Sequence, residues 1–154
     1  MKKMKNKTFL LLILLALVFL VVIIFYNKIK IVCINSACFK VKVAKTAEEK
    51  RKGLMFKTTL PADSGMIFVY DKEGTYPIWM KNTLIPLDVI WIDKDNKIID
   101  IKSNLPPCKT ENCEVFKHKG KAKYILELNA GVVDENNIKV GDIVRFNSLY
   151  TIWR

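Results

Sequence analysis

An uninterrupted apolar segment near the amino terminus constrains this chain more than any other feature. Residues 8–26 contain no charged residue, no glycine and no proline, and nearly all of them are Leu, Ile, Val or Phe. A helix of this length, rising about 1.5 Å per residue, matches the roughly 30 Å thickness of bilayer hydrocarbon. The segment therefore predicts a transmembrane anchor. A buried core helix is the alternative, but such a helix is normally shorter and has a polar face.

The residues that flank this segment distinguish an anchor from a cleaved signal peptide. A signal peptide has an apolar stretch of about 7–15 residues and ends in a small-x-small cleavage site. Here the run is longer and continues into Phe-Tyr-Asn-Lys at residues 25–28, so we expect an uncleaved anchor. Four lysines lie before the segment and fewer lie close behind it, which predicts an internal amino terminus.

The expected organisation has three parts. Residues 1–7 form a cytoplasmic basic tail, residues 8–26 form a single-pass anchor that contacts membrane lipid, and residues 27–154 form one extracytoplasmic domain. The net charge of +11 is spread over scattered lysines, which is typical of a solvated surface, although attraction to anionic lipid head groups is an alternative. The sequence contains no basic helix and no aromatic–basic RNA motif, so nucleic acid is not an expected partner.

Four cysteines follow the apolar segment in two pairs of equal spacing, Cys33 with Cys38 and Cys108 with Cys113. Disulfides persist in oxidising environments outside the cytosol, so the spacing and the expected location predict two local disulfides. A shared zinc site is one alternative, although structural zinc more often uses CxxC pairs, and free thiols are the other. No cofactor is expected.

The rest of the chain predicts many short strands and one short helix. Residues 31–44 alternate around a turn at Asn35, which predicts a hairpin. Thr46 and Glu49 form a capping box, and Gly53 ends the helix that follows. Further strands are expected at residues 65–70, 77–80, 87–92, 97–103, 124–129 and 143–147. Residues 71–74 are expected to form a turn, 104–120 a long loop, and 131–137 a brief helix or turn. This pattern predicts a mostly β domain, an antiparallel sandwich or barrel.

The soluble part resembles the domain of unknown function 192 family, also called uncharacterised protein family 0127. The resemblance runs from about Phe39 to Phe146, and its most specific block is the run WMKNTLIPLDVIWID at residues 79–93. Its other marks, in chain order, are residues 46–49, 51–55, 65–68, 124–131 and 140–142. The resemblance implies a compact β fold of jelly-roll-like type that is often exported or membrane-anchored. It implies no activity, and the cysteine pair at Cys108 and Cys113 looks like a feature of a subset.

Residues 79–88 form the best candidate site, because they bring an aromatic, an ammonium, an amide, a hydroxyl and a carboxylate close together in sequence. Trp79 would serve as a stacking platform, Lys81 and Asn82 as donors, and Asp88 as an acceptor for a polar ligand. The alternative is a structural corner in which Asn82 and Thr83 bond the turn and Asp88 pairs with Lys81.

Glu127 lies in a strand whose neighbours are apolar, and it points to the same side as Ile125. A buried carboxylate rarely lacks a partner. It is therefore expected either to pair with Lys81 or Arg51, or to line a cleft with Asp88. Two carboxylates in one cleft would permit acid–base hydrolysis.

Three methionines beside Trp79, namely Met55, Met66 and Met80, suggest a soft Cu(I) site, although methionine is more often core filler. The sequence lacks the motifs of serine hydrolases, P-loop enzymes and zinc proteases, and residues 93–95 lack the glycine and glutamate of a calcium loop. The single histidine, His118, lies in a lysine-rich loop and is expected to be exposed.

These observations favour a non-enzymatic extracytoplasmic module that binds a small polar ligand, a glycan or a partner protein. The candidate ligand-binding residues are Trp79, Lys81, Asn82, Thr83, Asp88 and Glu127. The alternatives are a cell-envelope hydrolase that uses Asp88 and Glu127, and a Cu(I)-binding protein.

Overall fold

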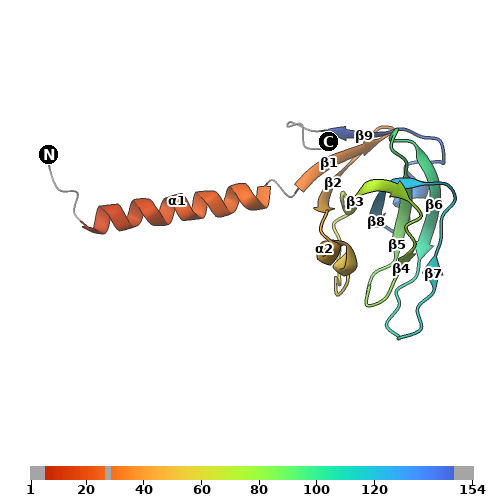
Figure 1. Ribbon diagram of the computed structural model, residues 1–154, viewed down its shortest axis with the longest axis horizontal. Coiled ribbons are helices and arrows are strands. Elements are labelled where there is room, and N and C mark those ends of the chain that lie inside the picture. Colours follow the sequence, from red (N-terminus) through yellow and green to blue (C-terminus); the bar gives the residue numbers. More distant parts are fainter. Residues whose placement is uncertain (1–5, 27–28, 148–154) are drawn as a thin grey trace.

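The computed structural model describes residues 6–26 and 29–147 of the 154-residue chain (Figure 1). Most of the predicted basic tail and the residues after 147 lie outside the described residues. The elements are α1 (Asn6–Tyr26), β1 (Ile29–Ile34), β2 (Ala37–Ala44), α2 (Ala47–Lys52), β3 (Ser64–Gly74), β4 (Ile78–Trp79), β5 (Leu87–Ile92), β6 (Ile98–Leu105), β7 (Val115–Phe116), β8 (Ala122–Asn129), α3 (Val132–Glu135) and β9 (Val144–Asn147).

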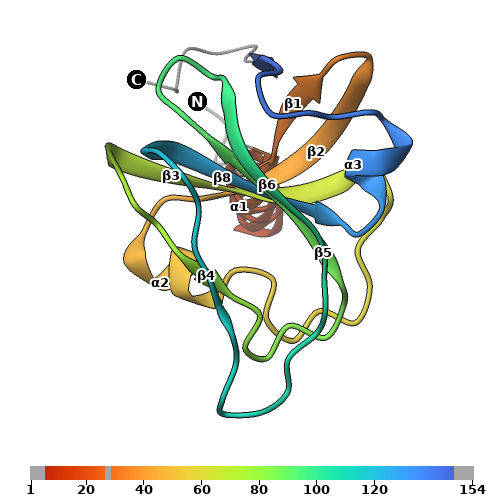
Figure 2. The same ribbon diagram turned by 90° about the vertical axis from the view of Figure 1, so that its right-hand side faces the viewer.

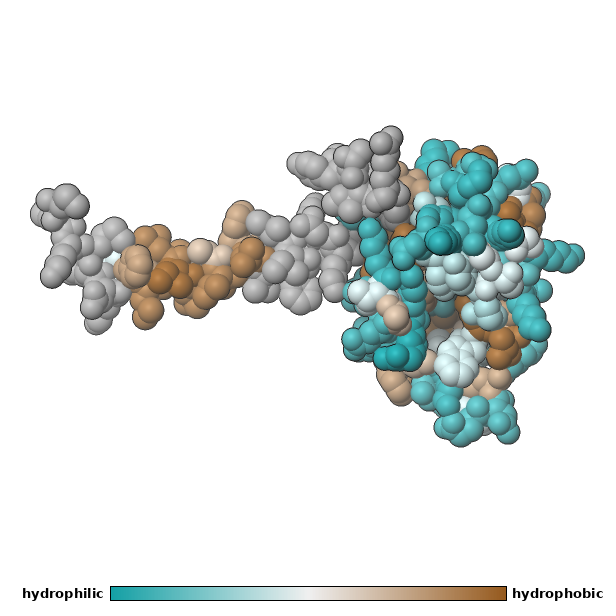
Figure 3. Space-filling view, in the orientation of Figure 1, coloured by the Kyte–Doolittle hydropathy of each residue, from teal (hydrophilic) through white to brown (hydrophobic). Residues whose placement is uncertain are grey.

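The predicted apolar segment is helical, and α1 extends over 21 residues. Its described side chains, those of residues 8–20, are exposed, and they appear brown in Figure 3 against the largely teal face of the domain. Within the described part of the chain, no helix is both long and apolar enough to cross a membrane. The helical conformation of α1 is observed, and the transmembrane assignment stays a prediction.

The domain is built on one curled seven-stranded sheet with the strand order β6-β5-β8-β3-β2-β1-β9. The two ends of the sheet approach each other, because Lys97 before β6 bridges Ile143 before β9. The result is a half-barrel. The mostly β prediction is confirmed, but the sheet is not wholly antiparallel, since β2 and β3 run parallel. A parallel pair requires a crossover connection, and the segment that contains α2 provides it.

The sheet separates two apolar clusters, one on each face. Leu126 and Leu128 of β8 belong to the cluster that packs with Val132 and Val133 of α3. Ile125, on the other face of β8, belongs to the cluster that includes Leu54 after α2 and Met80 after β4. Figure 2 shows the same division, with α2 and β4 on one side of the sheet and α3 on the other.

The β1–β2 hairpin and its disulfide follow the sequence prediction. Asn35 occupies the turn with a φ of 53°, and Cys33 lies directly opposite Cys38 in the register. The sulfur atoms are 2.07 Å apart in this pair and 2.10 Å apart in the pair formed by Cys108 and Cys113. Two local pairs therefore replace the shared metal site and the free thiols that were the alternatives.

Alkylation of the protein, purified without a reductant, should detect no free thiol. Without a reductant, iodoacetamide is expected to add no mass to the denatured chain, because each cysteine is covalently paired. After reduction, four carbamidomethyl groups should appear, as measured by intact mass spectrometry. Four adducts without reductant would contradict the assignment, and two would mean that one of the pairs is open.

The capping box at the start of α2 is confirmed. The Glu49 amide donates to Thr46 Oγ1 over 3.2 Å, and the Thr46 amide donates to Glu49 Oε2 over 3.1 Å. Each side chain satisfies a backbone donor that the first helical turn leaves unpaired. Gly53 ends the helix with a φ of 46° and a ψ of −132°.

Two local predictions are wrong. Residues 71–74, expected to form a turn, continue β3 after a shift in its pairing with β8 between Val69 and Gly74. The predicted loop at residues 104–120 contains β7, which pairs with β4, and Cys108 bridges both Lys81 and Thr83. This loop therefore forms part of a small second sheet and is not a free connection.

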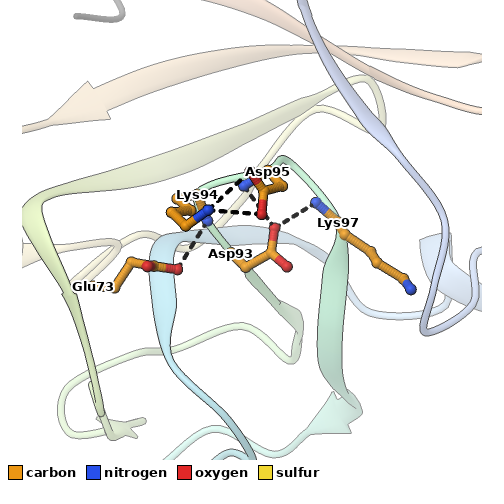
Figure 4. A network of polar contacts seen from close by, with 5 residues as sticks. All are labelled: Glu73, Asp93, Lys94, Asp95 and Lys97. Atoms are coloured by element: carbon orange, nitrogen blue, oxygen red, sulfur yellow. Dashed lines mark hydrogen bonds and ion pairs between the residues drawn. The ribbon is translucent and has the colours of Figure 1, made fainter.

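The turn between β5 and β6 is held by the Asp93 side chain, shown in Figure 4. Its Oδ1 accepts the backbone amides of Asp95 over 2.9 Å and Lys97 over 2.8 Å. The Lys94 ammonium pairs with Asp95, and the Lys94 amide donates to Glu73 of β3. An aspartate that bonds the backbone beyond it is a standard turn device, so these acidic residues have a structural explanation.

Candidate functional site: a cleft over Glu127

A cleft of about 90 Å³ opens between the end of α2 and the short strand β4, above one face of the sheet. This volume has room for several water molecules or a small organic group. The lining residues are Lys50, Arg51, Lys52, Gly53, Leu54, Met55, Phe68, Tyr70, Pro77, Ile78, Trp79, Thr83 and Glu127.

Glu127 lies on the sheet face that the cleft overlies. In the register of β8 it stands between Val89 of β5 and Met66 of β3, so its side chain has apolar neighbours on both sides. Its exposed fraction is 7%, and it makes no hydrogen bond or ion pair with any described residue. Burial raises the pKa of Glu127 to about 8 by desolvating the ionised form. The expected pairing with Lys81 or Arg51 is therefore not observed.

The end of α2 forms a basic wall of the cleft. Lys50, Arg51 and Lys52 all line it, and the Lys50 ammonium lies 4.4 Å from the centre of the Tyr70 ring. An ammonium over an aromatic face is attracted by the ring quadrupole, so this contact orients Lys50 toward the sheet. Desolvation is the main cause that raises the pKa of Tyr70 to about 12, followed by the charges of Tyr76 and Glu127.

Gly53 allows this wall to approach the sheet. A Cβ on Gly53 would lie 3.2 Å from Phe68 Cζ and 3.9 Å from Glu127 Oε2. Its positive φ combined with a strongly negative ψ is a conformation that is almost restricted to glycine. The position therefore requires glycine both for its backbone and for its neighbours.

Replacing Gly53 with alanine should destabilise the domain by about 1–3 kcal/mol, through backbone strain and the close contact with Phe68. The measurement is equilibrium denaturation followed by tryptophan fluorescence. Lys57→Ala, in an exposed position four residues further on, is the control and should change the free energy of unfolding by less than about 0.5 kcal/mol. Equal effects of the two variants would contradict the role given to Gly53.

The opposite wall holds two of the predicted site residues. Trp79 of β4 is 46% exposed and lines the cleft, as does the buried side chain of Thr83. The backbone of Tyr76 fixes this wall to the sheet: its amide donates to His118 Nε2 and its carbonyl accepts from Trp91 Nε1, each over 2.9 Å. The predicted stacking position of Trp79 is thus available to a ligand.

Lys81 and Asn82 lie outside the lining of the cleft. The Lys81 ammonium pairs with Glu111 and lies 5.7 Å from the centre of the Trp79 ring. Asn82 has a φ of 57°; its amide donates to the Cys108 carbonyl, and its carbonyl accepts from Phe56. Asn82 therefore serves the turn through its backbone.

Asp88 is buried on the other face of the sheet, and its expected position beside Glu127 is wrong. Its Oδ1 accepts the Asn104 amide and its Oδ2 accepts the Val133 amide, each over 2.8 Å. Neighbouring register positions explain the separation: Asp88 stands opposite Leu128, and side chains alternate between the faces of a strand. Asp88 thus joins β5, β6 and α3, and it pairs with neither Lys81 nor Glu127.

The structure also places the three methionines of the suggested Cu(I) site and the histidine that was expected to be exposed. Met66 and Met80 pack in the apolar cluster below the cleft, whereas Met55 lines it. Within the described residues, no three His, Cys, Asp or Glu side chains form a group that would hold a metal. His118, expected to be exposed, is buried; its ring stacks on Trp91 with 5.3 Å between centres, and both ring nitrogens bond backbone atoms.

Sequence reasoning identified Trp79, Thr83 and Glu127 but missed the α2 side of the cleft. Arg51 was predicted only as a possible partner of Glu127, Lys50 and Lys52 read as ordinary surface residues of a short helix, and Tyr70 read as one end of a strand. Residues 51–55, which follow the capping box, were a mark of the family resemblance. This mark could have indicated that the end of α2 belongs to the site.

Three comparisons place the chain among known proteins. The family model DUF192, described as "Uncharacterized ACR", matches residues 30–146. A UPF0127 protein from Thermococcus sibiricus is 31% identical over 105 residues, which are 67% of this chain and 63% of that protein. A second, from Thermococcus kodakarensis, is 27% identical over 68% of this chain and 63% of its own length. The matched part thus spans less than two thirds of these relatives.

A solved structure agrees with the fold. The crystal structure of a protein of unknown function from Novosphingobium aromaticivorans superposes with a TM-score of 0.71 at 33% identity, covering 76% of this chain and 84% of that one. The family match includes the curled sheet apart from its end residues Ile29 and Asn147, and both walls of the cleft. The chain therefore belongs to the DUF192 family.

Proposed function

We propose that this chain is a membrane-anchored extracytoplasmic module that binds a small polar ligand in the cleft over Glu127. The observation that carries the proposal is a buried carboxyl group that has no hydrogen-bonding partner among the described residues and faces an open cleft. Burying such a group without a partner costs free energy, and a ligand that bonds to it would offset that cost. Unsatisfied polar groups of this kind gather at functional sites.

The composition of the cleft supports a ligand of modest size. Trp79 offers an exposed ring, Thr83 a hydroxyl, and Met55 and Ile78 apolar contact. A few convergent polar groups on apolar walls are typical of small-molecule sites. The volume of about 90 Å³ suits a small ligand or the end of a larger one better than a broad protein surface.

Two features support the membrane anchor and the external location. Along α1, every described side chain from Thr8 to Leu20 is exposed, and large apolar residues form nearly all of this surface. Water disfavours such a surface, and lipid would cover it. The two cysteine pairs at bonding distance are suited to an oxidising compartment.

Thermal unfolding of the full-length protein tests the binding function. The chain would be prepared in a polyoxyethylene detergent, because detergents with sugar head groups could compete for the site, and screened against small metabolites and sugars. A ligand of the cleft should raise the melting temperature of the parent and of Val140→Ala, an exposed site distant in sequence from the cleft. It should raise that of Trp79→Ala and Thr83→Val much less. Equal stabilisation of all four proteins would remove the cleft from consideration.

A further inference from the structure

We propose that the ligand of this cleft carries an anionic oxygen group, a carboxylate or a phosphate, held by the basic wall of α2 and by a hydrogen bond from the Glu127 carboxyl group as a neutral acid. This inference rests on the proposed binding function and specifies the chemistry of its ligand. It depends on the charges around the cleft, on the position of Glu127, and on how the aromatic faces are used.

The charges around the cleft favour an anion. Among the described residues that line it, Lys50, Arg51 and Lys52 are cationic, and Glu127 is the single acid. Lys81 adds a further positive charge beside Trp79, although Glu111 partly balances it. A cleft with charges of one sign on low-dielectric walls concentrates ligands of the opposite sign.

Glu127 would meet such a ligand as a hydrogen-bond donor. Its side chain has apolar neighbours in the sheet and lacks an ion pair with any described residue, so the empty cleft favours its neutral form. Its pKa, raised to about 8, agrees with a protonated group at neutral pH. A protonated carboxyl group has one O–H donor, and a short bond to an anionic oxygen is among the stronger neutral-to-charged hydrogen bonds.

A cationic ligand is less compatible with the same geometry. The aromatic faces that would bind a cation already have lysines near them, Lys50 over Tyr70 at 4.4 Å and Lys81 near Trp79 at 5.7 Å. An incoming ammonium would meet these like charges and those of Arg51 and Lys52. The titratable side chains that line the cleft around Glu127 are thus the three bases of α2 and Tyr70 of β3. The lining residues from β4 and the turn after it have no acidic or basic side chain.

Calorimetric titration of the full-length protein in polyoxyethylene detergent tests this chemistry. The anionic probes are inorganic phosphate, glycerol 3-phosphate and malonate. Choline and methylguanidinium are the cationic probes, and glycerol is the neutral one. At least one anionic probe should bind, with an affinity that falls as the salt concentration rises, because the contacts with the basic wall are screened. Arg51→Ala should weaken binding about tenfold or more, whereas Lys57→Ala, an exposed lysine outside the cleft, should leave it within about twofold.

The Glu127 variants separate the anionic ligand from a cationic one. Glutamine supplies an N–H donor in place of the acid O–H, so Glu127→Gln should bind the anionic probe within about threefold of the parent at pH 6.5. At pH 9 the affinity of the parent for the anionic probe should fall about tenfold, because Glu127 ionises and repels the anion. The affinity of Glu127→Gln should not fall in this way. Glu127→Ala, which has no donor, should bind weakly at both pH values.

The outcomes distinguish this inference from the function on which it rests. Binding of a cationic probe that Glu127→Gln abolishes would overturn the anionic ligand and leave the cleft as a binding site. Failure of all probes to bind would overturn both proposals. The same titration in nanodiscs of phosphatidylcholine, with and without phosphatidylglycerol, identifies the source of the anion. If phosphatidylglycerol abolishes probe binding, the natural ligand is a lipid head group. If probe binding is unchanged, the natural ligand is soluble.

Discussion

Asp88→Ala is expected to destabilise the domain by about 3–5 kcal/mol, since it leaves one buried and one part-buried backbone amide without an acceptor. The carboxylate has no exposed surface and accepts from Asn104 and Val133 over 2.8 Å each. The second bond caps the first turn of α3, for which Gly131 at the N-cap has no side chain to offer. Denaturant titration of the full-length protein, followed by the fluorescence of the buried Trp91, measures the loss.

The control for Asp88 is another aspartate near the same strand. Asp95 follows β5 in the exposed turn of Figure 4 and pairs with Lys94 there, and its side chain is 73% exposed. Asp95→Ala should change the free energy of unfolding by less than about 0.5 kcal/mol. If Asp88→Ala were as mild as Asp95→Ala, Asp88 would not hold these elements together, and its position would need another explanation.

Glu127→Gln is expected to stabilise the empty domain by about 3 kcal/mol at pH 7, because the parent must keep an isolated carboxyl group protonated in the folded state. In the unfolded chain this proton is released near the ordinary pKa of 4.5, whereas in the folded protein burial raises the pKa to about 8. The contribution of Glu127 to stability is therefore greatest below pH 4.5, falls as the pH rises toward 8, and is constant above it. Glutamine does not titrate and keeps the neutral hydrogen-bonding pattern.

The free energy of unfolding of both proteins, measured by denaturation at pH values between 4.5 and 9, tests this predicted pH dependence. The two proteins should be equally stable at the acidic end, and the parent should become steadily less stable than Glu127→Gln as the pH rises toward 8. Glu114→Gln, on an exposed residue before β7, is the control and should change stability at pH 7 by less than about 0.5 kcal/mol. A parent that gains stability relative to Glu127→Gln between pH 5 and 8 would mean that Glu127 is ionised beside a cation, and would also argue against an anionic ligand.

Local sequence signals predicted the local structure well. The alternation around Asn35 predicted the β1–β2 hairpin, the pair Thr46 and Glu49 predicted the start of α2, and the apolar-rich run 87–92 predicted a strand, all as observed. Each of these features depends on residues a few positions apart. Such interactions are encoded in short stretches, so a single sequence reveals them.

The arrangement of the site depended on contacts between distant residues. Asp88 and Glu127 both look like inward-facing acids, and only the pairing of β5 with β8 shows that they point to opposite faces. His118 lies among lysines in the sequence, yet it stacks on Trp91 of β5. The basic wall became part of a cleft because the parallel crossover carries α2 over the sheet, and no local pattern announces a parallel pair of this kind.

The strand order of the sheet has a consequence for the timing of folding. The last described strand, β9, pairs with the first, β1, and the late strand β8 lies between β3 and β5. β1 can pair with β2 as soon as both are made, but its other edge has to wait for β9, more than a hundred residues later. Contacts of such high sequence separation are typical of domains that fold in milliseconds to seconds. Until β9 has paired, the chain presents unpaired strand edges, so we expect it to be most vulnerable to aggregation and proteolysis before that step.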